Sequence, residues 1–178
     1  MKKQKVNMSV WLCTNPLRGD KIEGGQGQMF PQRFVSQLNK YYSTEGKKVL
    51  WMFCGSVRPS KDNDTCDIRK ETKATYVCSF KDIPEKKKYD MIIADPPYNA
   101  LYAEEWSADL PKPKHIIEKA VKLLKPGGIL LLFHIIVTPT YRKKTNFERI
   151  GLHPVLCGLG NAIRVVNVLL KEYENTKI

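Results

Sequence analysis

Apolar runs alternate with amphipathic segments along this chain. The inner runs are apolar throughout, which is typical of strands that are covered on both faces of a mainly parallel sheet. The last two runs are joined by a turn that contains glycine, and we expect them to form an antiparallel hairpin at the end of the sheet. Altogether, short apolar or β-branched runs predict strands at 48–53, 65–68, 75–78, 91–94, 129–135, 154–156 and 163–170.

Two segments have the spacing of amphipathic helices. Apolar side chains recur on one face between Pro31, which suits a first helical position, and Tyr41. The segment 113–124 carries a stripe of isoleucine, alanine, valine and leucine and ends at a Pro-Gly-Gly turn. A third, shorter helix is predicted over 143–150. Together with the strands, these helices predict an α/β fold.

The connections after the first two strands are unusually short. Residues 54–64 are polar and interrupted by a proline, and the segment 69–74 is too short for a helical crossover. We therefore expect a sheet that is trimmed of the crossover helices after its first two strands. One face of such a sheet would be thinly covered, so we also expect the chain to associate with itself or with a second subunit.

Length and charge narrow the class of protein. A length of 178 residues suits one domain with one core. Lysine and arginine outnumber aspartate and glutamate by 30 to 18, which gives a net charge of +12. This excess favours a polyanionic partner, usually nucleic acid, and a purely solubilising surface is the alternative. Because no basic amphipathic helix stands out, a membrane partner is not expected.

The five cysteines form no Cys-x-x-Cys pair and no cluster with histidine, so no metal site is expected. Most of them lie in apolar, strand-like segments, and we expect them to be reduced and buried, as in a cytoplasmic protein. The N-terminal segment lacks the long apolar stretch of a signal peptide. The longest apolar run, 128–137, is too short to span a bilayer.

The segment Asp95-Pro96-Pro97-Tyr98 directly follows a predicted strand. Open α/β sheets bind ligands at the carboxyl ends of their strands. Each proline fixes its φ and removes an N–H group, so the segment offers a carboxylate and carbonyls but few donors. These acceptors suit an amino group of the substrate, such as the exocyclic amine of a nucleobase, and the Tyr98 ring can stack on an extruded base. The alternative is a tight turn in which Asp95 caps the backbone and Tyr98 packs.

This segment resembles the (D/N)PP(Y/F) motif of the S-adenosylmethionine-dependent amino-methyltransferases. These enzymes methylate adenine N6 or cytosine N4 in DNA, and relatives act on RNA or on protein amides. The resemblance extends from about residue 26 to residue 171. It implies a Rossmann-like class I methyltransferase fold over 1–178, in which 1–30 lies near the cofactor and 31–178 forms the core. It also implies S-adenosyl-L-methionine as cofactor and, as catalytic residues, Asp95, Pro96, Pro97 and Tyr98.

The resemblance further implies where the cofactor binds. The segment 49–57 resembles the first-strand motif Phe-x-Gly-x-Gly, and Asp67 stands where the family has an acid that accepts both ribose hydroxyls. Each position has a plainer alternative, since Gly55 can serve only a turn, Asp67 can be a surface acid, and the phenylalanines can be core. The implied cofactor-binding residues are Phe30, Pro31, Phe53, Cys54, Gly55, Ser56, Asp67, Ser79, Phe80 and Asp82.

Two positions depart from the family pattern. Val57 stands where the last glycine of the first-strand motif is expected, and Ser79 stands where an aspartate is common. A loop without the last glycine approaches a ligand less closely. We therefore expect modest affinity for the cofactor.

Substrate contacts are expected in two segments, the loop 99–114 and the basic segment 141–150. The aromatic residues of the first can stack on a base or pack the loop, and the basic residues of the second can contact phosphates at the active-site edge or form a solvated helix face. We expect adenine N6 in DNA to be the target. The alternatives are an RNA methyltransferase acting on adenine N6 or guanine N2, and a nucleic-acid-binding subunit that keeps the fold without turnover. The candidate residues are Tyr102, Trp106, Arg142, Lys143 and Lys144.

Overall fold

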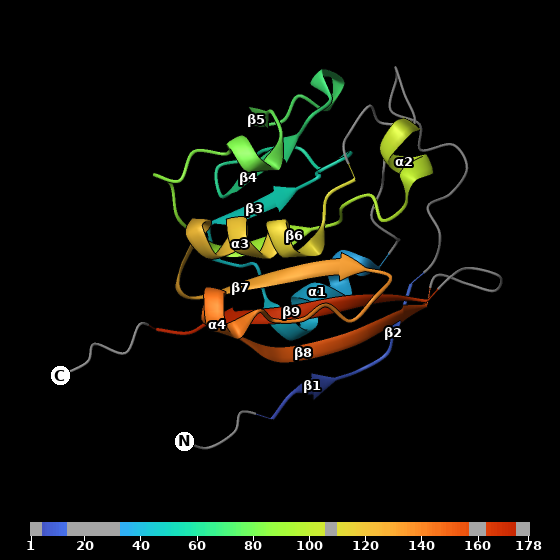
Figure 1. Ribbon diagram of the computed structural model, residues 1–178, viewed down its shortest axis with the longest axis vertical. Coiled ribbons are helices and arrows are strands. Elements are labelled where there is room, and N and C mark those ends of the chain that lie inside the picture. Colours follow the sequence, from blue (N-terminus) through green and yellow to red (C-terminus); the bar gives the residue numbers. More distant parts are fainter. Residues whose placement is uncertain (1–4, 14–32, 106–109, 157–162, 174–178) are drawn as a thin grey trace.

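A computed structural model describes residues 5–13, 33–105, 110–156 and 163–173 of the chain. Their strands form one sheet in the order β1-β8-β9-β7-β6-β3-β4-β5, and β2 also pairs with β8 (Figure 1). The strands are β1 Asn7–Met8, β2 Trp11–Leu12, β3 Val49–Met52, β4 Asn63–Asp67, β5 Tyr76–Val77, β6 Tyr89–Ala94, β7 Leu124–His134, β8 Phe147–Leu156 and β9 Arg164–Lys171.

The two longest helices lie on opposite faces of this sheet (Figure 1). One is α1, at Phe34–Tyr42, and the other is α3, at Pro113–Leu123, which begins with proline in its first turn as the sequence predicts. The remaining helical segments are α2 Ala100–Glu105, α4 Arg142–Thr145, and the 3-10 helices η1 Lys70–Thr72 and η2 Phe80–Asp82. Within the described residues, every helix is too short or too polar to cross a bilayer.

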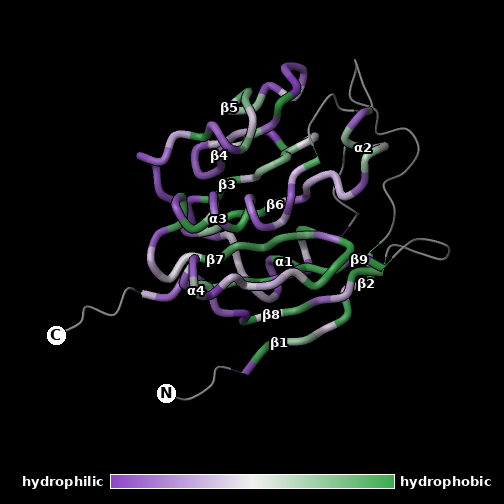
Figure 2. The backbone as a smooth tube through the Cα atoms, in the orientation of Figure 1, coloured by the Kyte–Doolittle hydropathy of each residue, from purple (hydrophilic) through white to green (hydrophobic). Residues whose placement is uncertain are grey.

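The parallel strands alternate their side chains between the two helix layers. In β3, Leu50 and Met52 belong to the core beneath α3, whereas Val49 and Trp51 belong to the core beneath α1. The central strands are correspondingly hydrophobic in Figure 2. Because both faces of β3 are buried, its sequence is a continuous apolar run instead of an alternating one.

The end of the sheet is antiparallel, as expected. Strand β9 runs antiparallel to both β7 and β8, whereas the other strands pair in parallel. The prediction of a helix over 143–150 is wrong, because α4 ends at Thr145 and β8 begins at Phe147. Asn146 adopts a left-handed conformation with φ 50°, and Phe147 is fully buried beneath α3. Burial of this ring outweighs the local helical spacing.

The structure confirms that crossover helices are missing. Residues 53–62 contain no helix, and only the single turn of η1 joins β4 to β5. The expected bare face is nevertheless not found over β3, since Val57 and Ala74 from these short connections pack on the core that contains Trp51. Exposed apolar side chains gather instead on the β1–β2 segment, at Val6, Met8, Val10 and Leu12.

The β1–β2 segment is an addition that the hydrophobic pattern does not predict. Each strand has only two residues, which is too short to give a period, and both pair in parallel with β8 at the sheet edge. Trp11 is fully buried and stacks on Tyr41 of α1, with ring centroids 5.9 Å apart, and on His153 of β8, at 4.7 Å. One indole therefore joins the N-terminal segment to a helix and a strand.

His153 of β8 forms hydrogen bonds to the other two of these elements, the N-terminal segment and α1. Its Nε2 lies 2.6 Å from the Tyr42 hydroxyl, and its Nδ1 lies 2.8 Å from the Ser9 hydroxyl. Burial lowers the pKa of His153, and burial together with Tyr41 raises the pKa of Tyr42 to about 12. The imidazole is thus neutral at pH 7 and is hydrogen-bonded to the Tyr42 hydroxyl. This pair leaves no space at Gly151, where a Cβ would lie 2.1 Å from the Tyr42 hydroxyl.

We predict that Gly151→Ala destabilises the protein by about 2 kcal/mol, because the new methyl group displaces Tyr42 from His153. Urea unfolding followed by tryptophan fluorescence measures the change. Tyr42→Phe removes the obstructing hydroxyl, so the double variant should lose less than the sum of the two single variants. Strict additivity of the two losses would contradict this account.

Candidate active site at the carboxyl edge of the sheet

Strand register brings the predicted site residues to one edge of the sheet. Met52 in β3 lies between Cys66 in β4 and Ala94 in β6. The next residues along these strands, Phe53, Asp67 and Asp95, therefore emerge side by side at the carboxyl edge. The three segments are separated by up to 42 residues in the sequence (95 − 53 = 42) and converge only because the strands are parallel.

The loop after β3 is a tight turn with two residues at positive φ. Phe53 has φ 59° and Gly55 has φ 53°. The amide of Cys54 donates to the carbonyl of Cys66 at 3.0 Å, and the amide of Val57 donates to the carbonyl of Cys54 at 2.9 Å. Since Val57 packs into the core beneath α1, a side chain at this position turns away from the edge. This explains how the loop forms without the last glycine of the family pattern.

The Cys54 side chain belongs to the core and not to the carboxyl edge of the sheet. Its side chain is fully buried, and burial, aided by the nearby Asp67 carboxylate, raises its pKa to about 11. The group is therefore an uncharged thiol at neutral pH. Cys13 and Cys66 are buried as well, Cys78 is half-buried, and all four are free thiols. Cys157 lies outside the described residues.

Asp67 is held by four donors at the end of β4. Its Oδ2 accepts from the amide of Gly55 at 3.1 Å and from Nη2 of Arg69 at 3.1 Å. Its Oδ1 accepts from the amide of Arg69 at 3.1 Å and from Nε of Arg69 at 3.0 Å. Burial alone would lower the pKa of Arg69, but the bonds to Asp67 raise it above its ordinary value. A carboxylate has about four lone-pair positions, so this one is saturated within the protein.

The short helix η2 borders the same edge beside β5. Ser79 caps it, accepting from the amide of Lys81 at 3.4 Å, which explains why serine suits this position. Phe80 is 6% exposed, and its ring lies 5.4 Å from that of Phe53. Asp82 is exposed. The two phenylalanine rings thus form an aromatic wall next to the loop after β3.

The motif after β6 combines a buried acid with a more accessible ring. Asp95 is 1% exposed, Pro96 and Pro97 are buried, and Tyr98 is half-buried. The Tyr98 ring meets the His134 ring edge-on, with centroids 6.3 Å apart and planes at 65°. Neither proline has an amide hydrogen, so the backbone here offers only acceptors.

His134 is a site residue that sequence analysis missed. It ends β7 and is 6% exposed, and burial lowers its pKa, so the ring is neutral at pH 7. The position of His134 follows from strand register, since β6 and β7 pair Ala94 with Leu132. Continuing that register by two residues places His134 opposite Pro96, which no local pattern indicates.

A buried amide fixes the chain just after His134. Asn167 of β9 is fully buried, accepts from the amide of Thr138 at 3.0 Å, and donates to the carbonyl of Ile136 at 3.1 Å. Arg149 of β8 donates to the same Asn167 oxygen at 2.8 Å and also to the Thr138 carbonyl. These bonds position the segment that follows β7, and with it the wall of the site beside Tyr98.

The basic residues Arg142 and Lys144 lie away from this edge. Helix α4 directly precedes the start of β8, which pairs with the end of β9, beside the start of β7. It therefore lies at the amino edge of the sheet (Figure 1), because the chain returns across the sheet between β7 and α4. The expected placement of these residues at the active-site edge is wrong, and Arg142 instead pairs with Glu172 at 2.8 Å.

Some predicted residues cannot be placed. Phe30, Pro31 and Trp106 lie outside the described residues, as do the side chains of Tyr102 and Lys143. The structure thus brings together the loop after β3, Asp67, η2 and the motif after β6, and the roles of all these candidates stay predictions.

No protein-family model matches this sequence, and no curated protein matches it. Solved structures match it in fold. TrmN from Thermus thermophilus has a TM-score of 0.57 at 16% identity over 80% of this chain, which spans about half, 49%, of TrmN. The N-methyltransferase NodS from Bradyrhizobium japonicum, in complex with S-adenosyl-L-homocysteine, has a TM-score of 0.56 at 11% identity over 79% of this chain and 86% of NodS.

A third match is 1,6-didemethyltoxoflavin-N1-methyltransferase from Burkholderia thailandensis, with bound 1,6-didemethyltoxoflavin and S-adenosylhomocysteine. Its TM-score is 0.53 at 9% identity over 78% of this chain and 76% of that enzyme. At such low identity the likeness concerns the fold alone. The chain has the Rossmann-like fold of the class I methyltransferases.

Proposed function

We propose that this protein transfers a methyl group from S-adenosylmethionine to an exocyclic amine of a nucleobase, with adenine N6 in DNA as the target. The observation that carries the proposal is the position of Asp95-Pro96-Pro97-Tyr98. In a class I methyltransferase fold, this motif follows β6 at the edge where Phe53, Gly55 and Asp67 also converge. The net charge of +12 supports a polyanionic substrate.

The edge beside the motif fits the cofactor. Gly55 is buried at positive φ, so the backbone can approach a ligand where a side chain would strain the turn. Phe53 and Phe80 provide an aromatic wall for a purine, and Asp67 ends β4, where a carboxylate can accept ribose hydroxyls. NodS and the toxoflavin methyltransferase hold S-adenosylhomocysteine, the demethylated form of this cofactor, in the same fold.

Arg69 competes with the cofactor in this arrangement. Because Asp67 already receives four hydrogen bonds, a ribose hydroxyl must replace at least one donor from Arg69. The Gly55 amide keeps the carboxylate oriented toward the loop after β3 throughout. This competition gives a structural reason for the modest affinity that the sequence predicts.

S-adenosylmethionine, when bound, supplies an electrophilic methyl group. The chain's own contribution is to prepare the amine, whose lone pair is delocalised into the aromatic ring of the base. Hydrogen bonds from the amine to the Asp95 carboxylate and the Pro96 carbonyl favour a pyramidal nitrogen with a localised lone pair. Since Asp95 is almost fully buried, these bonds act with little competition from water. Proline stiffness holds both acceptors in place.

Tyr98 is proposed to hold the target base by stacking. Its ring is half-buried and is braced at one edge by the neutral His134 imidazole. Because burial keeps His134 uncharged, the ring can pack beside an aromatic base without bringing a charge into the site. Position and orientation of the amine then supply much of the remaining rate.

We predict that Asp95→Ala lowers methyl transfer about 10²–10³-fold, the usual loss when one preorganised polar contact is removed. Asp95→Asn, which keeps an oxygen acceptor, should lose less. Transfer of tritiated methyl groups to adenine-containing DNA and to RNA of the same sequence measures the rate. Calorimetric titration should show unchanged cofactor affinity for both variants. Normal turnover by Asp95→Ala would refute the acceptor mechanism, and methylation of RNA alone would refute the DNA assignment.

Tyr98→Ala should reduce methyl transfer about 5–150-fold, because a stacked base is worth about 1–3 kcal/mol. Tyr98→Phe is the matched control, since it keeps the ring and removes only the hydroxyl, and it should retain most activity. Comparing the two variants by kcat/KM on the same DNA separates stacking from hydrogen bonding. Equal losses in both variants would assign the role to the hydroxyl and not to the ring.

Asp67 and Arg69 should have opposite effects on cofactor binding. Asp67→Ala removes the acceptor for the ribose and should weaken S-adenosylmethionine binding about 10-fold, as expected for a lost charge-assisted hydrogen bond. Arg69→Gln frees the carboxylate and should tighten binding. Calorimetry on the purified protein measures both. Unchanged affinity in Asp67→Ala would show that this acid does not contact the cofactor.

A further inference from the structure

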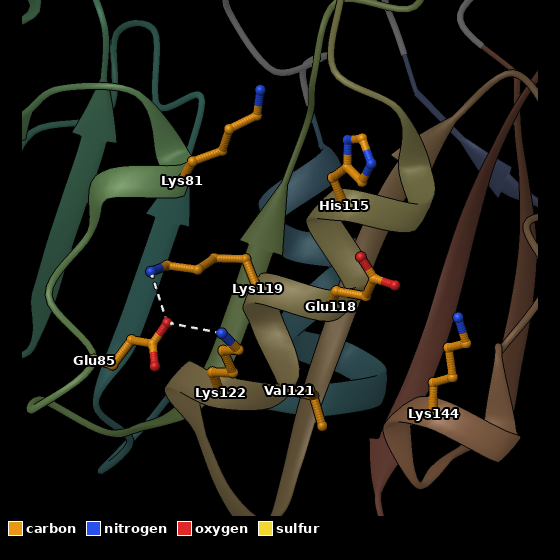
Figure 3. Close-up of a pocket in the computed structure, with 8 residues that line it drawn as sticks. All are labelled: Lys81, Glu85, His115, Glu118, Lys119, Val121, Lys122 and Lys144. Carbon is orange, nitrogen blue, oxygen red and sulfur yellow. Dashed lines mark hydrogen bonds and ion pairs between the residues drawn. The ribbon is translucent and has the colours of Figure 1, made fainter.

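A positively charged groove lies on the outer surface of α3, apart from the proposed catalytic residues (Figure 3). It has a volume of about 630 Å³ and is lined from η2, the segment after it, α3 and α4. Four of its eight lining residues are lysines, and Val121 contributes an apolar patch to its wall. The lining residues are Lys81, Glu85, His115, Glu118, Lys119, Val121, Lys122 and Lys144.

The ion pairs in the groove leave an excess of positive charge. Lys119 and Lys122 share a single carboxylate oxygen of Glu85, at 3.1 Å and 3.4 Å (Figure 3). Hydrogen bonding from Lys119 lowers the pKa of Glu85, so this carboxylate stays ionised at neutral pH. Glu118 in turn lies 3.9 Å from Lys114, outside the lining set. Counting the lining residues, four lysines face two glutamates, an excess of two positive charges.

The cations come from η2, α3 and α4 and do not converge on one point. Lys119 and Lys122 lie one turn apart on α3, and Lys81 and Lys144 lie on opposite sides of this helix (Figure 3). A pocket for one small anion needs donors that point to a single centre. Cations spread over three elements suit an extended polyanion, since one DNA strand carries a charge about every 3.4 Å of helix rise.

The groove also begins at the proposed catalytic edge. Lys81 lies on η2, next to the aromatic wall residue Phe80, and α3 starts at the carboxyl edge and runs back across the sheet (Figure 1). Lys144 on α4 lies at the other end, at the amino edge. The groove thus extends from the edge that carries the candidate site toward the amino edge of the sheet.

We propose that this groove binds the phosphate backbone of a DNA strand as it leaves the catalytic edge. The identity of the polymer rests on the proposed function, whereas the polyanion site rests on the groove itself. Lys81 and Lys144, which are exposed and make no ion pair with the carboxylates of the lining, contact phosphates directly. Lys119 and Lys122 are restrained by Glu85 and provide the central part of the positive field.

The test measures binding of a fluorescein-labelled single-stranded 20-mer DNA by anisotropy across a range of salt concentrations. Each lost phosphate contact lowers the slope of log K against log salt by about 0.7. The double variant Lys81→Gln/Lys144→Gln should therefore reduce the slope by about 1.4 and weaken binding. The matched control Lys5→Gln/Lys40→Gln removes the same charge from exposed positions before β1 and on α1, and should leave the slope unchanged.

Glu85→Gln provides a test of opposite sign. It frees Lys119 and Lys122 from their shared carboxylate, so DNA should bind more tightly and with a steeper salt slope. A merely structural role for this cluster predicts no gain. Equal slopes for the groove and control variants, or weaker binding by Glu85→Gln, would overturn the proposal.

The failure of this proposal is distinguishable from failure of the proposed function. Cofactor titration and methyl transfer are measured separately from DNA binding, and cofactor affinity should be the same in all groove variants. Groove-dependent DNA binding without any methyl transfer would refute only the proposed function. Methyl transfer with no groove dependence would refute only this inference, and groove-dependent binding of an RNA of the same sequence but not of DNA would refute the choice of polymer.

Discussion

The parallel register of β3, β4 and β6 is the constraint on which the rest of the structure depends. Pairing of Met52 with both Cys66 and Ala94 puts the ends of three strands at the same height. Side chains buried on both faces make a slip costly, because a shift by one residue exchanges the two helix layers. The acid of β4, the loop after β3 and the motif after β6 are therefore assembled by the core and not by contacts among themselves.

The trimmed connections show how little a methyltransferase-like sheet needs on its α1 face. Val57 and Ala74 pack against the core that contains Trp51, so two loop residues contribute packing where crossover helices are expected. The same short connections also shape the candidate site. Val57 packs against the core, which explains why a side chain is tolerated where the family pattern has glycine. Arg69, in the short segment after β4, donates hydrogen bonds to the Asp67 carboxylate. The short loops and the modest cofactor affinity that the sequence predicts would thus have a common origin.

The candidate catalytic edge and the α3 surface differ in charge. The catalytic edge combines a buried acid, two prolines and a neutral histidine, which suit an uncharged base. The α3 surface carries lysines that are only partly neutralised by Glu85. In the proposed function, bases are recognised at the dry edge and phosphates at the solvated surface, so each kind of contact has its preferred environment.

The sequence by itself determined the α/β class, most strands, the two long helices and the segments of the candidate site, because each depends on a local pattern. The motif Asp95–Tyr98 was readable from its order of residues after a predicted strand, and the missing crossovers from the length of the connections. Only the tertiary structure decided that His134 lies against Tyr98 and that α4 lies at the amino edge of the sheet. These outcomes depend on strand register and on the path of the chain between strands, which join residues too distant in the sequence for any local spacing to relate them.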